Sequence, residues 1–200
     1  AYSGGGIFTV SIEGRCDRLY YASDADGDKI VKIKNWGNIY WKNFRWSFLG
    51  SANLTGATTA APIFEKTTSL DNMFGNCTSF DADLSSWDVS KTTDFNSMFS
   101  TSSIFNNNGS AGISGWTTTN AINFNLMFYQ AAAFNQPIDS WNVSNVTDFS
   151  WMFSLANSFD QPLTSWVTSA ATDMSTMFSS AIVFDQDIGD WDISNVITID

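Results

Sequence analysis

Residues Phe134–Phe153 read FNQPIDSWNVSNVTDFSWMF, and the pattern returns 25 residues later at Phe159–Phe178 as FDQPLTSWVTSAATDMSTMF. Each copy begins with Phe, reaches a Trp seven residues later, and closes on a Met-Phe pair whose Phe lies twelve residues beyond that Trp. Large aromatic residues that keep their spacing in successive copies predict a chain built from repeated structural units.

The same unit can be followed along most of the 200 residues. A less regular copy begins near Trp36, and four additional residues fall in FNNNGSAGISGW, residues 105–116, where Gly, Asn and Ser predict a loop insertion. A fixed period in this range is typical of coils that stack on their neighbours. The Met-Phe pairs are 25, 29, 25 and 25 residues apart and end at Phe74, Phe99, Phe128, Phe153 and Phe178.

Two shorter patterns predict the elements of each coil. Val146, Phe149, Phe153 and Ala156 are spaced for one face of a short helix. The segment around Ile138 follows a proline and predicts a short strand. We therefore predict an α/β solenoid of leucine-rich-repeat-like stacked coils, with one short parallel strand and one short helix per coil.

Stacked coils predict ladders of equivalent aromatic side chains through the core. Each ring would pack on its own equivalent in the next coil, and large rings dominate core energetics. The predicted Trp ladder comprises Trp87, Trp116, Trp141, Trp166 and Trp191, and the predicted Phe ladder comprises Phe99, Phe128, Phe153 and Phe178.

The first part of the chain follows a different pattern. GIFTVSIEG alternates apolar and polar residues, so residues 1–34 are predicted to form an N-terminal β-strand cap. Residues 35–200 are predicted to form the repeat solenoid, with an incomplete last coil. The chain begins with Ala1, and we expect it to be a processed or excised part of something longer.

The last coil suggests self-association. Val196 and Ile199 are spaced like Val146 and Phe149, which predicts the start of another helix beside an open parallel edge. Further repeats in a longer parent chain could cover that edge. The alternative cover is the N-terminal strand of a second copy, which would make end-to-end filaments and would use Phe8, Val10 and Ile12.

The charge excludes several classes of partner. The net charge is −11, and Thr92–Asp200 holds ten Asp and no basic residue. Such a surface repels phosphate backbones and anionic membranes, so we expect no nucleic-acid binding. No run of 18 apolar residues is present, so we expect no membrane insertion.

Catalytic signatures are missing from the sequence. The chain contains no His, so it cannot form a Ser-His or Cys-His pair. It has no phosphate-binding glycine loop and no zinc motif. We predict that it is not an enzyme and has no catalytic residues.

One segment resembles a calcium loop. SDADGDK places Asp24, Asp26 and Asp28 at alternate positions around Gly27, the carboxylate spacing that Ca²⁺ loops use. A complete calcium-binding loop of that type would have Glu at its twelfth position, where Asn35 stands. An Asp-Gly turn between two strands is the competing interpretation. Ca²⁺ is the one cofactor that the sequence suggests.

Two further sets of residues have competing interpretations. Cys77 occupies a column of small residues and is predicted to be a buried structural thiol, with a disulfide to Cys16 as the alternative. Recurrent Asp and Asn residues are predicted to cap turns, with cation binding as the alternative. They form the columns Asp81, Asn106, Asn135, Asp160 and Asp185, and Asp94, Asn123, Asp148 and Asp173.

The repeat resembles a known bacterial family. The copies at 127–153 and 152–178 are similar to the surface-protein repeat of about 25 residues found in mycoplasma and Listeria surface lipoproteins and in BspA-like leucine-rich proteins. YSGGGIFTVSIEG resembles the last strand of a PKD-like or Ig-like module that can precede such arrays. This sequence departs from the pattern at 105–116 and at 57–66, which lacks the Trp.

The resemblance implies a location and a broad role. It implies an extracellular or cell-surface structural or adhesion protein that acts through protein–protein interaction, and it carries no catalytic residues. The first alternative is a filament subunit that stacks end to end. The second alternative is a surface module that binds cations or glycans.

Overall fold

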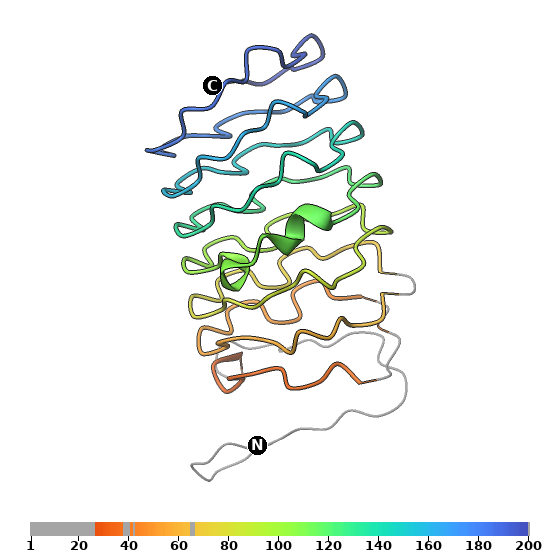
Figure 1. The fold of residues 1–200 in the computed structure, drawn as a ribbon, viewed down its shortest axis with the longest axis vertical. Helices are drawn as coiled ribbons and strands as arrows, with labels where there is room; N and C mark the ends of the chain where they lie inside the picture. Colours follow the sequence, from red (N-terminus) through yellow and green to blue (C-terminus); the bar gives the residue numbers. More distant parts are fainter. Residues whose placement is uncertain (1–26, 38–40, 42, 65–66, 200) are drawn as a thin grey trace.

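The computed structural model describes residues 27–37, 41, 43–64 and 67–199. In this part of the chain, successive repeats form coils that lie one on another along the long axis of the molecule (Figure 1). The N-terminal coils lie at the bottom of this view and the C-terminal coils at the top. The predicted cap at residues 1–34 lies mostly outside the described residues.

The predicted α/β content is wrong. Across the described residues, the helices are two short 3₁₀ helices, η1 (Asn107–Gly109) and η2 (Ala111–Gly115), and both lie in the insertion. This part of the chain contains no strand and no sheet. Successive coils are joined by isolated parallel bridges, five of which form the unbroken series Ser69–Asp94, Asp94–Asn123, Asn123–Asp148, Asp148–Asp173 and Asp173–Thr198.

The segment expected to be a helix is a ribbon of turns. The N–H groups of Trp151 and Phe153 donate to carbonyls of the next coil, on Ser175 and Met177, each at 2.9 Å. The intervening N–H group of Met152 donates backward within the coil, to Phe149 at 3.1 Å. An α-helix requires every N–H to bond four residues back. Because alternate N–H groups leave the coil, the helical spacing of inward side chains here arises from successive turns.

This ribbon requires left-handed backbone twice in each coil. Trp151 has φ 61° and Leu155 has φ 60°, and the equivalent position of the first described coil is Gly50 at φ 74°. Residues with a Cβ adopt this conformation at a cost on the order of 1 kcal/mol. The other non-glycine examples in the two columns are Trp46, Asn72, Asn76, Ser97, Thr101, Leu126, Gln130, Thr176 and Ser180.

The predicted strand at Ile138 is also wrong. The Trp141 N–H donates to the Ile138 carbonyl at 3.0 Å, which closes a turn. Parallel pairing occurs instead at Asp148, where the chain enters the ribbon. The proline signal therefore marked a turn and not the first residue of a strand.

Stacked phenylalanines fill the core. Phe48, Phe74, Phe99, Phe128, Phe153 and Phe178 form one column, with ring centroids 5.6–5.9 Å apart between coils and nearly parallel planes. From Phe74 onward, each of these rings also stacks at 3.7–4.1 Å on a second Phe six residues later in the same coil. The second column comprises Phe80, Phe105, Phe134, Phe159 and Phe184.

From Trp116 onward, a tryptophan links each coil to the coil before it. The indole N–H of Trp141 donates to the Ile113 carbonyl at 2.9 Å, and that of Trp166 donates to Ile138 at 3.1 Å. Trp116 and Trp191 make the corresponding bonds to Leu84 and Leu163, each at 3.1 Å. The rings stack in two pairs, Trp116 with Trp141 at 5.8 Å and Trp166 with Trp191 at 6.0 Å. The Trp therefore contributes both apolar area and a directed hydrogen bond.

The insertion at 105–116 packs against the stack and is not a free loop. Asn107 is fully buried, and its side-chain oxygen accepts from the Leu84 N–H at 2.7 Å. Ile113 is also fully buried. Gly112 lies so close to Ser85 that a Cβ would overlap the serine side chain. The polar composition of this segment predicted a loop, but Asn107 and Ile113 are part of the buried interior.

Candidate functional site

The repeat provides an internal comparison for surface residues. Positions that the fold requires recur from coil to coil, so an exposed residue that departs from its column is not explained by the fold. Trp151 is 40% exposed, and its column also holds Trp46, Asn72, Ser97, Leu126 and Thr176. Tyr129 stands in the column of Leu49, Gly75, Ser100, Ser154 and Ser179. Trp151 therefore stands where three coils have a polar residue, and Tyr129 stands where four coils have Gly or Ser.

These two residues form an aromatic cluster. The Tyr129 and Trp151 rings lie 5.9 Å apart at 77°, an edge-to-face arrangement. Leu126 is the equivalent of Trp151 on the preceding coil, and its N–H donates to the Ser150 carbonyl at 3.0 Å. The Tyr129 hydroxyl accepts from the Gln130 amide at 3.1 Å. The aromatic cluster is therefore an ordered patch on one side of the stack.

Trp151 holds its exposed position against a backbone preference. Its φ of 61° is easier for Asn or Gly than for a tryptophan. Burial does not explain the choice, because the side chain is 40% exposed. The left-handed conformation recurs in every coil of this column and belongs to the fold, so the choice of a tryptophan is the feature that the backbone leaves unexplained.

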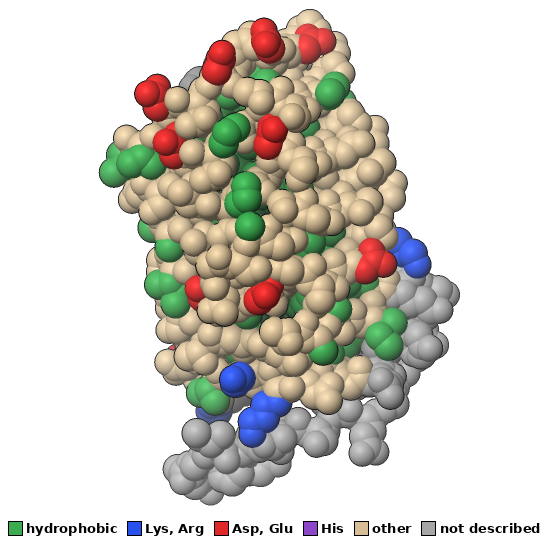
Figure 2. Space-filling model, in the orientation of Figure 1, with side chains coloured by type: hydrophobic (Ala, Val, Ile, Leu, Met, Phe, Trp, Pro, Cys, Tyr) green, Lys and Arg blue, Asp and Glu red, His purple; other side chains and the backbone are tan. Residues whose placement is uncertain are grey.

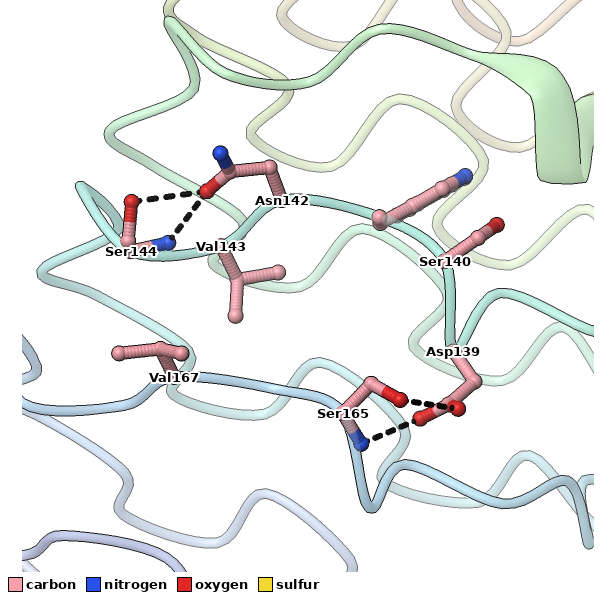
Figure 3. Close-up of a pocket in the computed structure, with 8 residues that line it drawn as sticks. Asp139, Ser140, Asn142, Val143, Ser144, Ser165 and Val167 are labelled. Atoms are coloured by element: carbon pink, nitrogen blue, oxygen red, sulfur yellow. Dashed lines mark hydrogen bonds between the residues drawn. The ribbon is translucent and has the colours of Figure 1, made fainter.

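A shallow groove lies on another part of the surface (Figure 3). Its volume is about 430 Å³, and it separates the coil at 139–144 from the coil at 165–167. Thr118 and Thr168 each donate a 3.0 Å hydroxyl hydrogen bond to the next coil. Val143 occupies the same position after its Trp and has no hydroxyl, so this link is missing at the groove. The lining residues are Asp139, Ser140, Trp141, Asn142, Val143, Ser144, Ser165 and Val167.

The polar groups of the groove bond to one another. The Asp139 carboxylate accepts from the N–H and the hydroxyl of Ser165, both at 2.7 Å. The Asn142 side-chain oxygen accepts from the N–H and the hydroxyl of Ser144, at 3.0 and 2.8 Å (Figure 3). The Asp139 bonds join two coils, whereas the Asn142 bonds stabilise a turn within one coil.

One Asp/Asn column caps turns. Asp148 and Asp173 each accept from the backbone N–H two residues later, at 2.9 Å. Asp94 and Asn123 do the same at 3.1 and 2.8 Å. The carboxylates therefore satisfy backbone donors within their own coil.

The other Asp/Asn column connects coils. Asn135 accepts from the N–H of Asp160 at 3.1 Å and from the side-chain amide of Gln161 at 2.9 Å. Asp160 accepts in the same way from Asp185 and Gln186, at 3.1 and 2.7 Å. The Gln186 amide, followed by the Asp185 N–H, lowers the pKa of Asp160 below its usual value. The N–H donors thus stabilise the negative charge of the Asp160 carboxylate in this column.

Most of the remaining predicted site residues lie outside the part of the chain that the structure describes. Asp24, Asp26, Phe8, Val10 and Ile12 lie outside the described residues, and Asp28 is exposed. Among the described residues, no three Asp, Glu, Cys or His side chains gather closely enough to hold a metal ion.

The predicted C-terminal helix does not form. The Val196 N–H donates to Ile193 at 3.0 Å in a turn, and the Ile197 N–H donates to Thr172 of the preceding coil at 2.8 Å. Val196 is half-buried, whereas Ile199 is 62% exposed.

The ladder residues occupy the core to different degrees. Trp191 and Phe178, in the last two coils, are half-buried, and the others are buried. Cys77 is buried with a free thiol. None of the helices in the described part is long and apolar enough to cross a bilayer.

Charge is distributed unevenly along the stack. Acidic side chains are concentrated over the C-terminal coils and basic side chains over the N-terminal end (Figure 2). This follows from the sequence, since no Lys or Arg occurs after Lys91. The aromatic cluster lies in the acidic half of the chain.

Comparison with known families now places the chain. The family model described as "Mycoplasma protein of unknown function, DUF285" matches residues 42–137 and again 107–200. The chain belongs to this family. The match agrees with the mycoplasma part of the resemblance seen in the sequence, whereas the BspA-like, Listeria and leucine-rich-repeat parts remain a resemblance. No curated protein and no solved structure matches this chain.

Proposed function

We propose that this chain is a cell-surface or extracellular repeat module that binds another protein through the side of its coil stack. The observation that carries the proposal is the aromatic cluster, in which a half-buried Tyr129 packs edge-to-face on an exposed Trp151. The repeat family and the resemblance to bacterial surface proteins support the location.

The composition of the cluster favours a protein partner. Tyrosine and tryptophan are enriched in the buried centres of protein interfaces and contribute a large share of binding free energy there. Three other coils build the same backbone with Asn72, Ser97 or Thr176 in place of Trp151, and two build it with Trp46 or Leu126. The aromatic side chains are therefore additions to the fold, and adhesion is the specific role that we assign to them.

End-to-end assembly is the alternative, and a different observation favours it. Ile197 is 86% exposed and Ile199 is 62% exposed on the last described coil. A second copy or a further repeat would bury these side chains. Sedimentation at micromolar concentration distinguishes the two roles, since end-to-end assembly predicts species that grow with concentration. A single monomeric boundary would contradict it.

Cation or glycan binding has weaker support. The Asp and Asn side chains of the two columns accept from N–H groups, and the described residues offer no cluster of three metal-binding side chains. The groove at Asp139 is lined by groups that already bond to one another.

The experiment for surface binding uses intact cells of the source organism. An antibody against the chain should label them, and protease added outside should remove the label. The purified chain should then bind the cells saturably, and Trp151→Ser, which installs the residue of the Ser97 position, should reduce that binding. Equal binding by both proteins would show that the cluster is not the contact surface.

A further inference from the structure

The described part of the chain contains a complete example of a tryptophan covered by a cation. The Arg45 guanidinium lies over the Trp46 ring, with Cζ 5.2 Å from the ring centroid. The same guanidinium pairs with Asp71 on the next coil, at 2.9 Å. Trp46 has φ 58° and occupies the column of Trp151. This repeat can therefore present a left-handed, outward-facing tryptophan to an arginine.

The coil of Trp151 presents the same ring without the cation. The residue before Trp151 is Ser150, whose hydroxyl donates to Asp148 at 2.5 Å, whereas the residue before Trp46 is Arg45. No Lys or Arg occurs after Lys91, so the acidic half of the chain supplies none. Among the described residues, no cation lies over the Trp151 ring.

The surroundings of Trp151 favour a positive occupant. Asp148 lies three residues before it, and Asp173 holds the equivalent position on the next coil. Ten Asp and no basic residue occur between Thr92 and Asp200. Complementary charge steers a basic partner toward such a surface. The face of a tryptophan attracts a guanidinium or an ammonium group, and arginine is the more frequent partner.

We propose that Trp151, with Tyr129 beside it, receives an arginine side chain from a basic segment of a partner protein. The contact reproduces between two molecules what Arg45 and Trp46 make within this one. The proposal rests on the protein-binding role above and adds the chemistry of the partner. It excludes nucleic acid and anionic lipid as occupants, because both carry the same charge sign as this surface.

The test uses a defined probe and the whole 200-residue chain. The probe is the peptide acetyl-GRGRGRG-amide, with acetyl-GQGQGQG-amide as the uncharged control and the lysine version as the second cation. Binding is measured by titration while the indole N–H signals of the nine tryptophans are followed by NMR. The arginine peptide should shift the Trp151 signal, bind more tightly than the lysine peptide, and weaken as salt is added.

Matched variants isolate the ring. Trp151→Ser should weaken binding of the arginine peptide roughly three- to fivefold, the size expected of an exposed cation–π contact. Trp46→Asn, which installs the residue of the Asn72 position in the same column, should leave binding unchanged. Ser150→Arg keeps Trp151 and supplies a cation from within the chain, as Arg45 does for Trp46. It should also weaken binding, provided that circular dichroism shows a folded protein.

The outcomes separate this proposal from the proposed function. Equal binding of the glutamine and arginine peptides, or undiminished binding by Trp151→Ser, would overturn the arginine site. If Trp151→Ser nevertheless reduces binding to intact cells, the protein-binding surface stands with a different occupant. If peptide binding behaves as expected but cells bind both proteins equally, the arginine site stands and the cell-surface role fails.

Discussion

The indole N–H of Trp141 donates a 2.9 Å hydrogen bond to the carbonyl of Ile113 on the preceding coil. The side chain is also almost fully buried, so this residue holds two coils together by packing and by a directed bond. The two contributions can be measured separately.

Replacement of Trp141 should show this division. Trp141→Phe keeps a ring but leaves the Ile113 carbonyl without its donor, and it should lower the free energy of unfolding by about 1–3 kcal/mol. Trp141→Ala also leaves a cavity and should cost about 3–5 kcal/mol. Urea denaturation followed by fluorescence gives both values. A loss near zero for Trp141→Phe would show that the hydrogen bond contributes nothing, and equal losses for the two variants would show that the packing of the ring contributes nothing beyond it.

The insertion should be sensitive at Gly112 and tolerant at Gly115. A Cβ at Gly112 would overlap Ser85, whereas a Cβ at Gly115 meets no atom within 4 Å. Gly112→Ala should therefore cost about 1–3 kcal/mol, as overpacked sites do, and Gly115→Ala should cost far less. Thermal unfolding of the two variants checks this. Similar melting temperatures would mean that η2 is not packed on the preceding coil.

The left-handed column should accept asparagine with a gain in stability. Ser180 is exposed at φ 57°, and the equivalent residues of the first two described coils are Gly50 and Asn76. Ser180→Asn should raise the free energy of unfolding by about 0.5 kcal/mol, since asparagine tolerates this conformation better than serine. Ser179→Asn, one residue earlier and outside the left-handed column, serves as the control. A gain in both variants, or in neither, would contradict the explanation.

Stability should fall at alkaline pH because of Cys77. Burial raises the pKa of this thiol from 9.0 to about 12, outweighing the opposing hydrogen bond with the Ser51 backbone. The unfolded chain then loses its proton at lower pH than the folded chain. The stabilisation is complete below pH 9 and is lost as the pH rises toward 12, at up to about 1.4 kcal/mol per pH unit.

Cys77→Ala is the matched variant for this pH dependence. The same column holds Ala131, Ala156 and Ala181, so the substitution fits the fold. The alkaline loss should be smaller in the variant than in the parent, by denaturation at pH 8, 9 and 10. The native thiol should also resist iodoacetamide until the chain unfolds. Rapid alkylation of the folded protein would show that the thiol is exposed.

The sequence predicted the repeat but not its backbone. Phe153 and Trp141 keep their spacing because their rings contact equivalents in adjacent coils, and that spacing is visible in one sequence. The helix expected at Val146–Ala156 is wrong because inward side chains three and four residues apart also arise from a ribbon of turns. The left-handed conformation of Leu155, with φ 60°, could not be predicted from the sequence, since leucine rarely adopts it.

Part of the candidate site could have been predicted by aligning the repeat copies. Alignment of the copies places Trp151 in a column where Asn72, Ser97 and Thr176 are polar and where Trp46 is a second tryptophan, so an aromatic residue differs there from half of the coils. What the alignment does not give is exposure: Trp141, ten residues earlier, is almost fully buried. The ring contact with Tyr129 requires two coils to be in register, which only the structure supplies.

The alternating hydrogen bonds of the ribbon bear on how such genes change length. Phe153 and Leu155 find acceptors only on the following coil, so one copy in isolation would leave its backbone donors unpaired. A duplication of one whole unit would regenerate every donor–acceptor pair, whereas a gain of one or two residues within the ribbon would misalign them all. Recombination between copies is therefore the tolerated route to longer and shorter forms. Small insertions should accumulate where the stretch after Phe105 lies, outside the ribbon.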